Sequence, residues 1–378
     1  MTTTAMAGPE SARRPGPSPE SMHELMRQDL PLLDVGLDEW TCRMMRWHFS
    51  DPTGAPFWLR QRPALGFDPL RDVSGFADLR RFGVFDTELL RQAPVRDLLP
   101  RGFAGRPFRV FETGGTTGAP CRIVNVTRLG NDVLMYAAML RARGLAGLDI
   151  VAMTPSGPHA YGHFVEGLAD SWGGAVCAID FDPRWVKHEL RSGGDPEGYL
   201  AHLLRQTVSL LLRREAGLLF TTTRLLLALA AELDDPLGEH GIRAVCTGGT
   251  SVSAEEERFL RREFLGDVQW IDTYGNTLVG HALPAEPLAD GGPRSYHLAP
   301  PFGEVRVADP ADWTRTAGYG ERGRVVTTTL LEDLFIPNLI ERDSAVRAGP
   351  HPWFQWDGVA RVGPAGDASE AATAEGVY

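Results

Sequence analysis

The sequence of 378 residues contains almost no lysine, because Lys187 is the only one and arginine supplies the other strongly basic side chains. In spite of these arginines, the formal net charge is −11 at pH 7. An acidic chain has no general attraction for nucleic-acid phosphates or anionic lipids. We therefore expect neither nucleic acid nor a membrane among its partners. A reaction that needs a lysine ammonium has a single residue available for it.

Cysteine is also scarce, and the four cysteines lie far apart without a CxxC pair. This spacing argues against a zinc site or a disulfide framework. Cys177 and Cys246 lie in apolar runs, which predicts that both thiols are buried. No apolar run is long enough to span a membrane, and residues 1–20 lack the apolar segment of a signal peptide. We therefore expect a cytoplasmic protein.

Short β-rich runs alternate with helical patterns from Phe108 onward. This alternation predicts an α/β fold with a largely buried sheet. Strands are predicted at 108–111, 149–153, 175–179, 243–246 and 268–271, and helices at 223–233, at 253–265 and from about Leu129.

Residues 303–329 differ, because they predict β-strands joined by Gly and Pro turns, with a β-branched strand at 323–329. The composition of the ends predicts disordered tails at 1–20 and 363–378. Between them, residues 21–362 show no repeat and no linker. We interpret them as a single domain.

The most informative segment is the Gly/Thr loop, Thr113 to Pro120, with the sequence Thr-Gly-Gly-Thr-Thr-Gly-Ala-Pro. Its glycines let the backbone approach a ligand and expose N–H groups, and its threonines add hydroxyl donors, which suits phosphate oxygens. The loop lacks the GK[ST] ending of a Walker A motif and is not GxGxxG. The alternative is a tight turn of small residues.

The loop resembles the phosphate-binding signature of the adenylate-forming superfamily, which includes acyl- and aryl-CoA synthetases, peptide-synthetase adenylation domains and firefly luciferase. Further segments resemble that family's motifs in the family order. They are the aromatic/His loop 158–164 of the phenylacetate–CoA ligase branch, the adenine-flanking segment 246–253, the Tyr-Gly motif 272–277, the strand 320–329 and the ribose motif 342–343.

The resemblance implies the large N-terminal domain of the adenylate-forming fold, with β-sheets packed between helices and a small β-rich C-terminal part. It implies ATP and Mg²⁺ as cofactors and a carboxylic acid as substrate. The residues that it assigns to ATP or its phosphates are Thr113, Gly114, Gly115, Thr116, Gly118, Gly248, Gly249, Thr250, Asp272, Tyr274, Gly275 and Asp343. Catalytic roles fall to Thr117, Thr277 and Arg122, and the acid pocket to His159, Tyr161, His163 and Phe164.

Several positions depart from the family pattern. Gly114 replaces a hydroxyl residue, and Cys121 stands where the family has lysine, so that Arg122 would supply the charge. Leu278 replaces the glutamate that helps to hold magnesium. We therefore assign no protein ligand to a metal and expect phosphates and water to hold Mg²⁺.

The usual C-terminal domain with its catalytic lysine has no counterpart in this sequence. The acyl-protein synthetases of bacterial luminescence resemble this chain in length and also lack that domain. They transfer the acyl group to a cysteine near the C-terminus, a step that is not expected here because no cysteine follows Cys246.

The sequence thus predicts an enzyme that activates an aryl or acyl acid as its adenylate, releases pyrophosphate and feeds an external acceptor. That acceptor would be CoA, a carrier protein, an amine or another small nucleophile, with a second-step enzyme as a possible partner, in specialised metabolism. The competing hypothesis is a degenerate nucleotide-binding partner of another ligase, which Leu278 and Cys121 favour. Structural roles also stay open for Tyr274, as a core aromatic, and for Asp343, as a solvated acid. They stay open for His159 and His163 as well.

Overall fold

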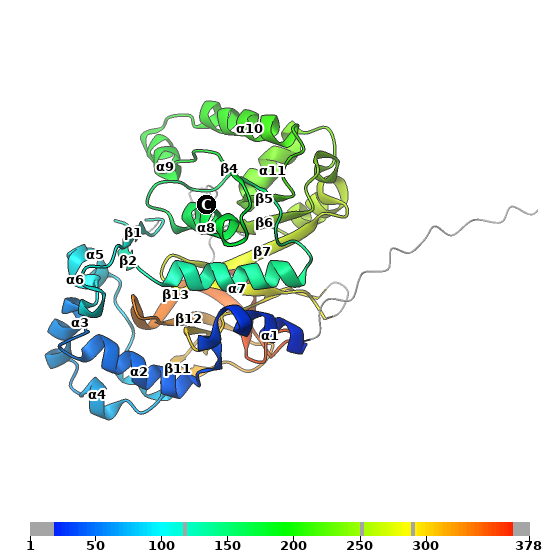
Figure 1. The fold of residues 1–378 in the computed structure, drawn as a ribbon. Helices are drawn as coiled ribbons and strands as arrows, with labels where there is room; N and C mark the ends of the chain where they lie inside the picture. Colours follow the sequence, from blue (N-terminus) through cyan, green and yellow to red (C-terminus); the bar gives the residue numbers. More distant parts are fainter. Residues whose placement is uncertain (1–18, 116–118, 250–252, 289–291, 366–378) are drawn as a thin grey trace, which may run out of the picture.

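The computed structural model describes residues 19–115, 119–249, 253–288 and 292–365. Within these residues, one mixed sheet of twelve strands runs through the molecule in the order β11-β10-β12-β13-β14-β9-β8-β7-β6-β5-β3-β4, and β1 and β2 form a separate hairpin (Figure 1). The strands are β1 (Arg109–Glu112), β2 (Arg122–Asn125), β3 (Ile150–Ala152), β4 (Val176–Ala178), β5 (Leu218–Thr221), β6 (Ala244–Gly248), β7 (Gln269–Asn276), β8 (Gly280–Ala285), β9 (Ser295–His297), β10 (Gly303–Asp309), β11 (Asp312–Thr316), β12 (Arg322–Leu330), β13 (Phe335–Ala348) and β14 (Gly358–Pro364).

The first half of the sheet is parallel, because β4, β3, β5, β6 and β7 pair side by side in the same direction. Its strands are apolar on both faces. On β6, Ala244 and Cys246 belong to one core cluster and Val245 to the other, and on β7 Ile271 and Trp270 divide in the same way. Continuous apolar runs are typical of parallel strands that are covered on both faces.

Helices cover both faces of this half. Residues of α7 and α8 share one core cluster with the sheet, and residues of α10 and α11 share the other. Figure 1 shows α7 crossing in front of the sheet, between its parallel and antiparallel halves. The helices are α1 (Pro19–Asp29), α2 (Leu37–Phe49), α3 (Pro56–Gln61), α4 (Pro69–Asp72), α5 (Glu88–Gln92), α6 (Val95–Leu98), α7 (Arg128–Ala142), α8 (Ala160–Trp172), α9 (Pro183–Ser192), α10 (Glu197–Leu211), α11 (Thr223–Glu232) and α12 (Ala254–Phe259).

The second half of the sheet, from β8 to β14, is antiparallel. Its longest members, β12 and β13, pair from Arg322 opposite Val346 to Leu330 opposite Phe335. The predicted α/β architecture with a β-rich C-terminal part is confirmed, including the β-branched strand in β12. Strand β14 runs to Pro364, two residues past the predicted domain end at 362.

The prediction for one thiol is wrong. Cys246 is buried, but Cys177 is exposed. Its strand, β4, is the last strand of the sheet, so it has a neighbour on one side only. An apolar run on such an edge does not guarantee burial, because no second strand covers it.

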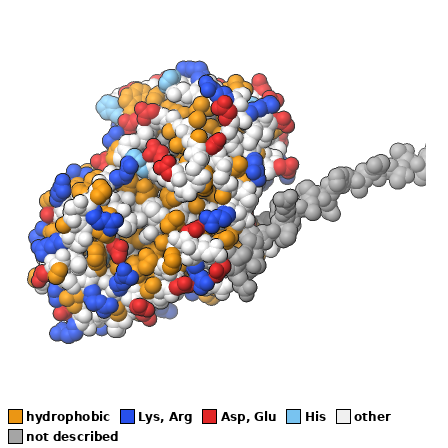
Figure 2. Space-filling model, in the orientation of Figure 1, with side chains coloured by type: hydrophobic (Ala, Val, Ile, Leu, Met, Phe, Trp, Pro, Cys, Tyr) orange, Lys and Arg blue, Asp and Glu red, His pale blue; other side chains and the backbone are white. Residues whose placement is uncertain are grey.

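No helix among the described residues has the length and apolarity needed to cross a membrane. Basic and acidic side chains are interspersed over the face shown in Figure 2.

One buried carboxylate joins the two halves of the fold. Asp333 follows β12, and its Oδ2 accepts hydrogen bonds from the backbone N–H groups of Val126 (2.6 Å), Thr127 (2.7 Å) and Arg128 (3.1 Å). These groups form the N-terminus of α7, where an anion is favoured by the orphan N–H groups and the helix dipole. Asp333 is 1% exposed. It therefore fixes α7 to the antiparallel half of the sheet.

We predict that Asp333→Ala lowers the free energy of unfolding by about 3–5 kcal/mol, because buried N–H groups lose a charged acceptor. Asp333→Asn keeps an oxygen acceptor and should lose less. Urea unfolding followed by circular dichroism measures both. The exposed Asp267 provides the matched control, and an Asp333→Ala loss no larger than that of Asp267→Ala contradicts the prediction.

Candidate active site

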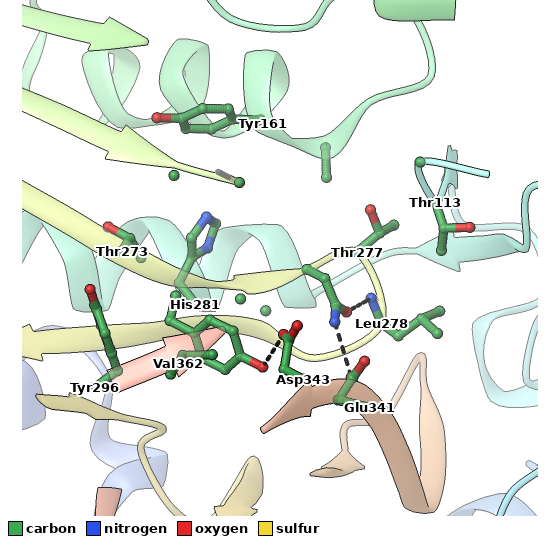
Figure 3. A pocket seen from close by; sticks show the side chains of 18 of the residues that line it. Thr113, Tyr161, Thr273, Thr277, Leu278, His281, Tyr296, Glu341, Asp343 and Val362 are labelled. Carbon is green, nitrogen blue, oxygen red and sulfur yellow. Dashed lines mark hydrogen bonds between the residues drawn. The ribbon is translucent and has the colours of Figure 1, made fainter. Parts of the chain in front are cut away.

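A cavity of about 1020 Å³ lies between the two halves of the sheet. Its walls come from the start of the Gly/Thr loop, from α7 and α8, from the ends of β6 and β7, and from β13 and β14. Figure 3 shows side chains from these elements converging on the cavity, with Thr113 at one end and Tyr296 at the other. Cavities of this size and mixed polarity are typical of small-molecule sites.

The Gly/Thr loop is closed at its neck. The Thr113 N–H donates to the carbonyl of Cys121, and the Cys121 N–H donates to the Thr113 hydroxyl oxygen, both at 2.9 Å. The thiol of Cys121, at the position where the adenylate-forming motif has lysine, is buried. Gly114 and Gly115 line the cavity, and Gly115 has a φ of +63°, which suits glycine.

The predicted phosphate residues Thr116, Thr117 and Gly118 lie outside the described residues, as does Thr250. Gly248 and Gly249 line the cavity at the end of β6, and Gly249 has a φ of +84°.

The only lysine contacts this loop. Lys187, on α9, is buried, and its Nζ donates to the carbonyl of Gly114 at 2.6 Å. Arg122 lies elsewhere, exposed on β2 opposite Glu112, and it is not among the cavity-lining residues. This placement gives no support to the phosphate role suggested for Arg122.

The turn between β7 and β8 brings Thr277 to the loop. Its hydroxyl lies 3.4 Å from the carbonyl oxygen of Glu112, the residue before Thr113. The buried guanidinium of Arg128 holds this turn by donating to the carbonyls of Asn276 and Thr277. Thr277 is thereby fixed beside the loop, although 165 positions of sequence separate it from Glu112.

Tyr274 and Asp343 meet in the same cavity. The Tyr274 hydroxyl donates to Asp343 Oδ2 at 2.9 Å, and burial raises the pKa of Tyr274, so this hydroxyl stays protonated. Beside them, Asn276 Nδ2 donates to Glu341 Oε1 at 3.0 Å (Figure 3). Burial raises the pKa of Glu341, and the neighbouring Asp343 adds to that shift.

Asp272 lines the cavity, but its carboxylate is already hydrogen-bonded to other side chains of the protein. It accepts hydrogen bonds from the hydroxyls of Thr247 and Tyr296, and Arg294 lies 3.8 Å away. Burial raises the pKa of Asp272, and Arg294 opposes that shift. The geometry therefore makes Asp272 a fixed part of the wall.

Three of the four residues assigned to the acid pocket line the cavity, and one does not. His159, Tyr161 and Phe164 line the cavity, whereas His163 lies outside it, with Nδ1 3.1 Å from both Arg109 and Glu166. Burial lowers the pKa of His159 to about 4, so it is neutral at pH 7. The Tyr161 hydroxyl donates to backbone carbonyls of β5 and β6.

The described residues contain no cluster of metal-ligating side chains. None of their His, Cys, Asp and Glu side chains form a group of three that could hold a metal ion. Leu278 offers no oxygen ligand and is buried.

Arg128, Asp132, His281 and Glu341 are among the cavity residues that the sequence motifs did not identify. Arg128 and Asp132 did leave a signal, because an Arg and an Asp four positions apart in a helix lie on one face and can pair. His281 and Glu341 left none, because their partners come from distant strands and helices.

Gly275 is required where β7 approaches β8. A Cβ atom at Gly275 would lie 1.9 Å from the carbonyl oxygen of Gly280, which is backbone and cannot move aside. We predict that Gly275→Ala destabilises the protein by about 1–3 kcal/mol. The control is Gly198→Ala on α10, where a Cβ atom would meet nothing within 4 Å beyond its own stretch of helix. Thermal unfolding measures both, and equal midpoints contradict the prediction.

No protein-family model matches the sequence, and no curated protein matches it. Solved structures do match. An open conformation of 2-hydroxyisobutyryl-CoA ligase, in complex with 2-HIB-AMP and CoA, superimposes with a TM-score of 0.56 at 14% sequence identity, over 90% of this chain and 73% of that one. The same ligase in its thioesterification state gives 0.57 at 17% identity, over 92% and 68%. The chain therefore has the adenylate-forming fold that its sequence motifs predicted.

Proposed function

We propose that this protein uses ATP to activate a carboxylic acid as an acyl-adenylate. One observation carries the proposal: Tyr274, bonded to Asp343, and Thr277, packed against the start of the Gly/Thr loop, line the same cavity. These residues come from separate motifs, and each motif suggests a contact to a different part of ATP. Their convergence supports a single nucleotide site.

The roles follow from the chemistry of each group. The ring of Tyr274 stacks on adenine, and the Asp343 carboxylate accepts from the ribose hydroxyls. The backbone N–H groups of Gly114 and Gly115 and the hydroxyl of Thr113 donate to phosphate oxygens. The Thr113 oxygen accepts from Cys121, so its hydrogen is left to be donated. Thr277 donates to the α-phosphate.

The reaction joins two anions. An oxygen of the substrate carboxylate attacks the α-phosphorus of ATP, and the bond from that phosphorus to the oxygen bridging to the β-phosphate breaks. Pyrophosphate leaves with the electron pair, and the acyl-adenylate remains. Such a transfer depends on positioning and on stabilising charge. Arg342 and Arg361 line the same cavity and would supply positive charge.

The acyl group then passes to an external acceptor: CoA, a carrier protein, an amine or another small nucleophile. The fold is shared with ligases solved with an acyl-AMP and CoA, which supports this class of reaction. The second candidate is a nucleotide-binding partner of another ligase that does not turn over. Leu278 and Cys121, at the positions of the family's glutamate and lysine, favour it.

ATP–pyrophosphate exchange with a panel of aryl and acyl acids tests the proposal. We expect exchange that depends on one class of acid. Asp343→Ala and Thr277→Ala should each lower the rate by about 10- to 100-fold, because each loses a hydrogen bond to ATP.

The matched controls are Asp267→Ala and Thr316→Ala, both at exposed positions, and their rates should equal that of the wild type. Tight binding of ATP or AMP without exchange for any acid would establish the non-catalytic alternative. Exchange that survives both site substitutions would show that the residues are wrongly assigned.

A further inference from the structure

A polar pair lies in the wall of the cavity, away from the Gly/Thr loop. Asp132 on α7 has its Oδ2 3.4 Å from Nδ1 of His281 on β8, and both residues line the cavity. The Asp132 side chain is only 10% exposed. Figure 3 shows the His281 ring pointing into the cavity on the side of Tyr161 and Thr273.

The hydrogen-bonding capacity of this pair is unused within the described part of the chain. The nearest polar neighbours of the Asp132 carboxylate there are His281 at 3.4 Å and Arg128 at 3.7 Å, neither in hydrogen-bond geometry. His281 Nδ1 is buried without a hydrogen-bond partner among those residues. Buried polar groups are nearly always satisfied. A carboxylate left in this state at a cavity wall is suited to a donor on a bound ligand.

The backbone leaves this carboxylate uncovered. Gly280, next to His281, has a φ of +96°, and a Cβ atom there would lie 3.2 and 3.3 Å from the two oxygens of Asp132. A side chain at position 280 would therefore crowd the carboxylate. Glycine keeps access from the cavity open.

The local charge favours a neutral donor. The buried Arg128 guanidinium faces Asp132 and is fixed by its bonds to the carbonyls of Asn276 and Thr277. This pair is already neutral overall, so an ammonium group would meet a nearby buried cation. A second carboxylate would be repelled by Asp132. A hydroxyl donates to the carboxylate without either cost.

The surrounding walls are aromatic. The His281 ring packs on Phe164 with centroids 4.4 Å apart and planes inclined by 33°, and the ring of Tyr136 lies 6.3 Å from His281. Flat rings of this kind pack well against an aromatic ligand.

We propose that Asp132 and His281 select an aromatic acid that carries a hydroxyl group. The hydroxyl donates to Asp132 and accepts from a ring N–H of His281, and the ring of the acid lies against Phe164 and His281. This inference rests on the proposed adenylation, because it names the acid that the reaction would use. Asp132 and His281 act here as specificity-determining residues and take no part in the chemistry.

The test compares hydroxybenzoic and hydroxycinnamic acids with benzoic, cinnamic and the corresponding aminomethyl-substituted acids, whose amine is an ammonium at neutral pH, by kcat/KM in ATP–pyrophosphate exchange. The wild type should favour a hydroxy acid over its unsubstituted partner by about 10- to 100-fold, the effect of a hydrogen bond to a charged group. Asp132→Asn should remove most of this preference. It should lower kcat/KM for the hydroxy acid, leave kcat/KM for the unsubstituted acid as it is, and leave the KM for ATP unchanged. Asp267→Asn, at an exposed position, is the matched control.

Removing Asp132 leaves Arg128 buried without its partner, so that variant could fail to fold. His281→Phe keeps a ring against Phe164 and removes the nitrogens, and it should reduce the same preference. An aminomethyl-substituted acid favoured over the hydroxy acid overturns the choice of a neutral donor. Equal kcat/KM for hydroxy and unsubstituted acids, or a preference unchanged in both variants, overturns the inference.

Binding of the same acids by isothermal titration calorimetry separates the two proposals. Exchange that does not distinguish hydroxy from unsubstituted acids refutes the inference and leaves adenylation intact. Selective binding of a hydroxy acid, lost in His281→Phe, combined with no exchange for any acid refutes adenylation and leaves the pocket assignment intact.

Discussion

The N-terminus of α7 is the point on which the site depends. Asp333, from the antiparallel half, accepts from three backbone N–H groups there. One residue into the helix, Arg128 donates to the carbonyls of the β7–β8 turn. These bonds tie three parts of the chain together, and all are buried or partly buried, where an unmade bond is costly. Without them the walls of the cavity would have no common anchor.

The same contacts allow a positive charge to be buried at the N-terminus of α7. Burial lowers the pKa of Arg128, while Asp132 and Asp333 oppose that shift. A buried cation is tolerated here because two carboxylates and two carbonyls surround it. The same arrangement places Asp132 in the cavity wall, one helical turn further along α7. The element that fixes Thr277 near the Gly/Thr loop therefore also supplies the polar group at the proposed acid end.

The polar groups of the cavity fall into two kinds. Asp272 is occupied by Thr247 and Tyr296, and the hydroxyl of Tyr161 by two backbone carbonyls, so these groups maintain the wall. The Asp132 carboxylate has no hydrogen bond from a described residue, and its polar neighbours are Arg128 at 3.7 Å and His281 at 3.4 Å. Residue type alone does not separate the two kinds, since aspartate occurs in both. Hydrogen bonding in three dimensions does.

The sequence by itself determined the α/β alternation, the β-rich C-terminal part and the family-like order of the segments around the Gly/Thr loop, Tyr274 and Asp343. Those features depend on local propensity, apolar periodicity and short motifs, all of which are encoded by residues close together in the sequence. Only the tertiary structure decided that Cys177 lies on an edge strand, that His163 is outside the cavity, and that Lys187 reaches Gly114. It also brought His281 to Asp132, 149 positions away in the sequence and 3.4 Å away in space. Contacts of this range depend on how the strands and helices pack, and no local pattern encodes them.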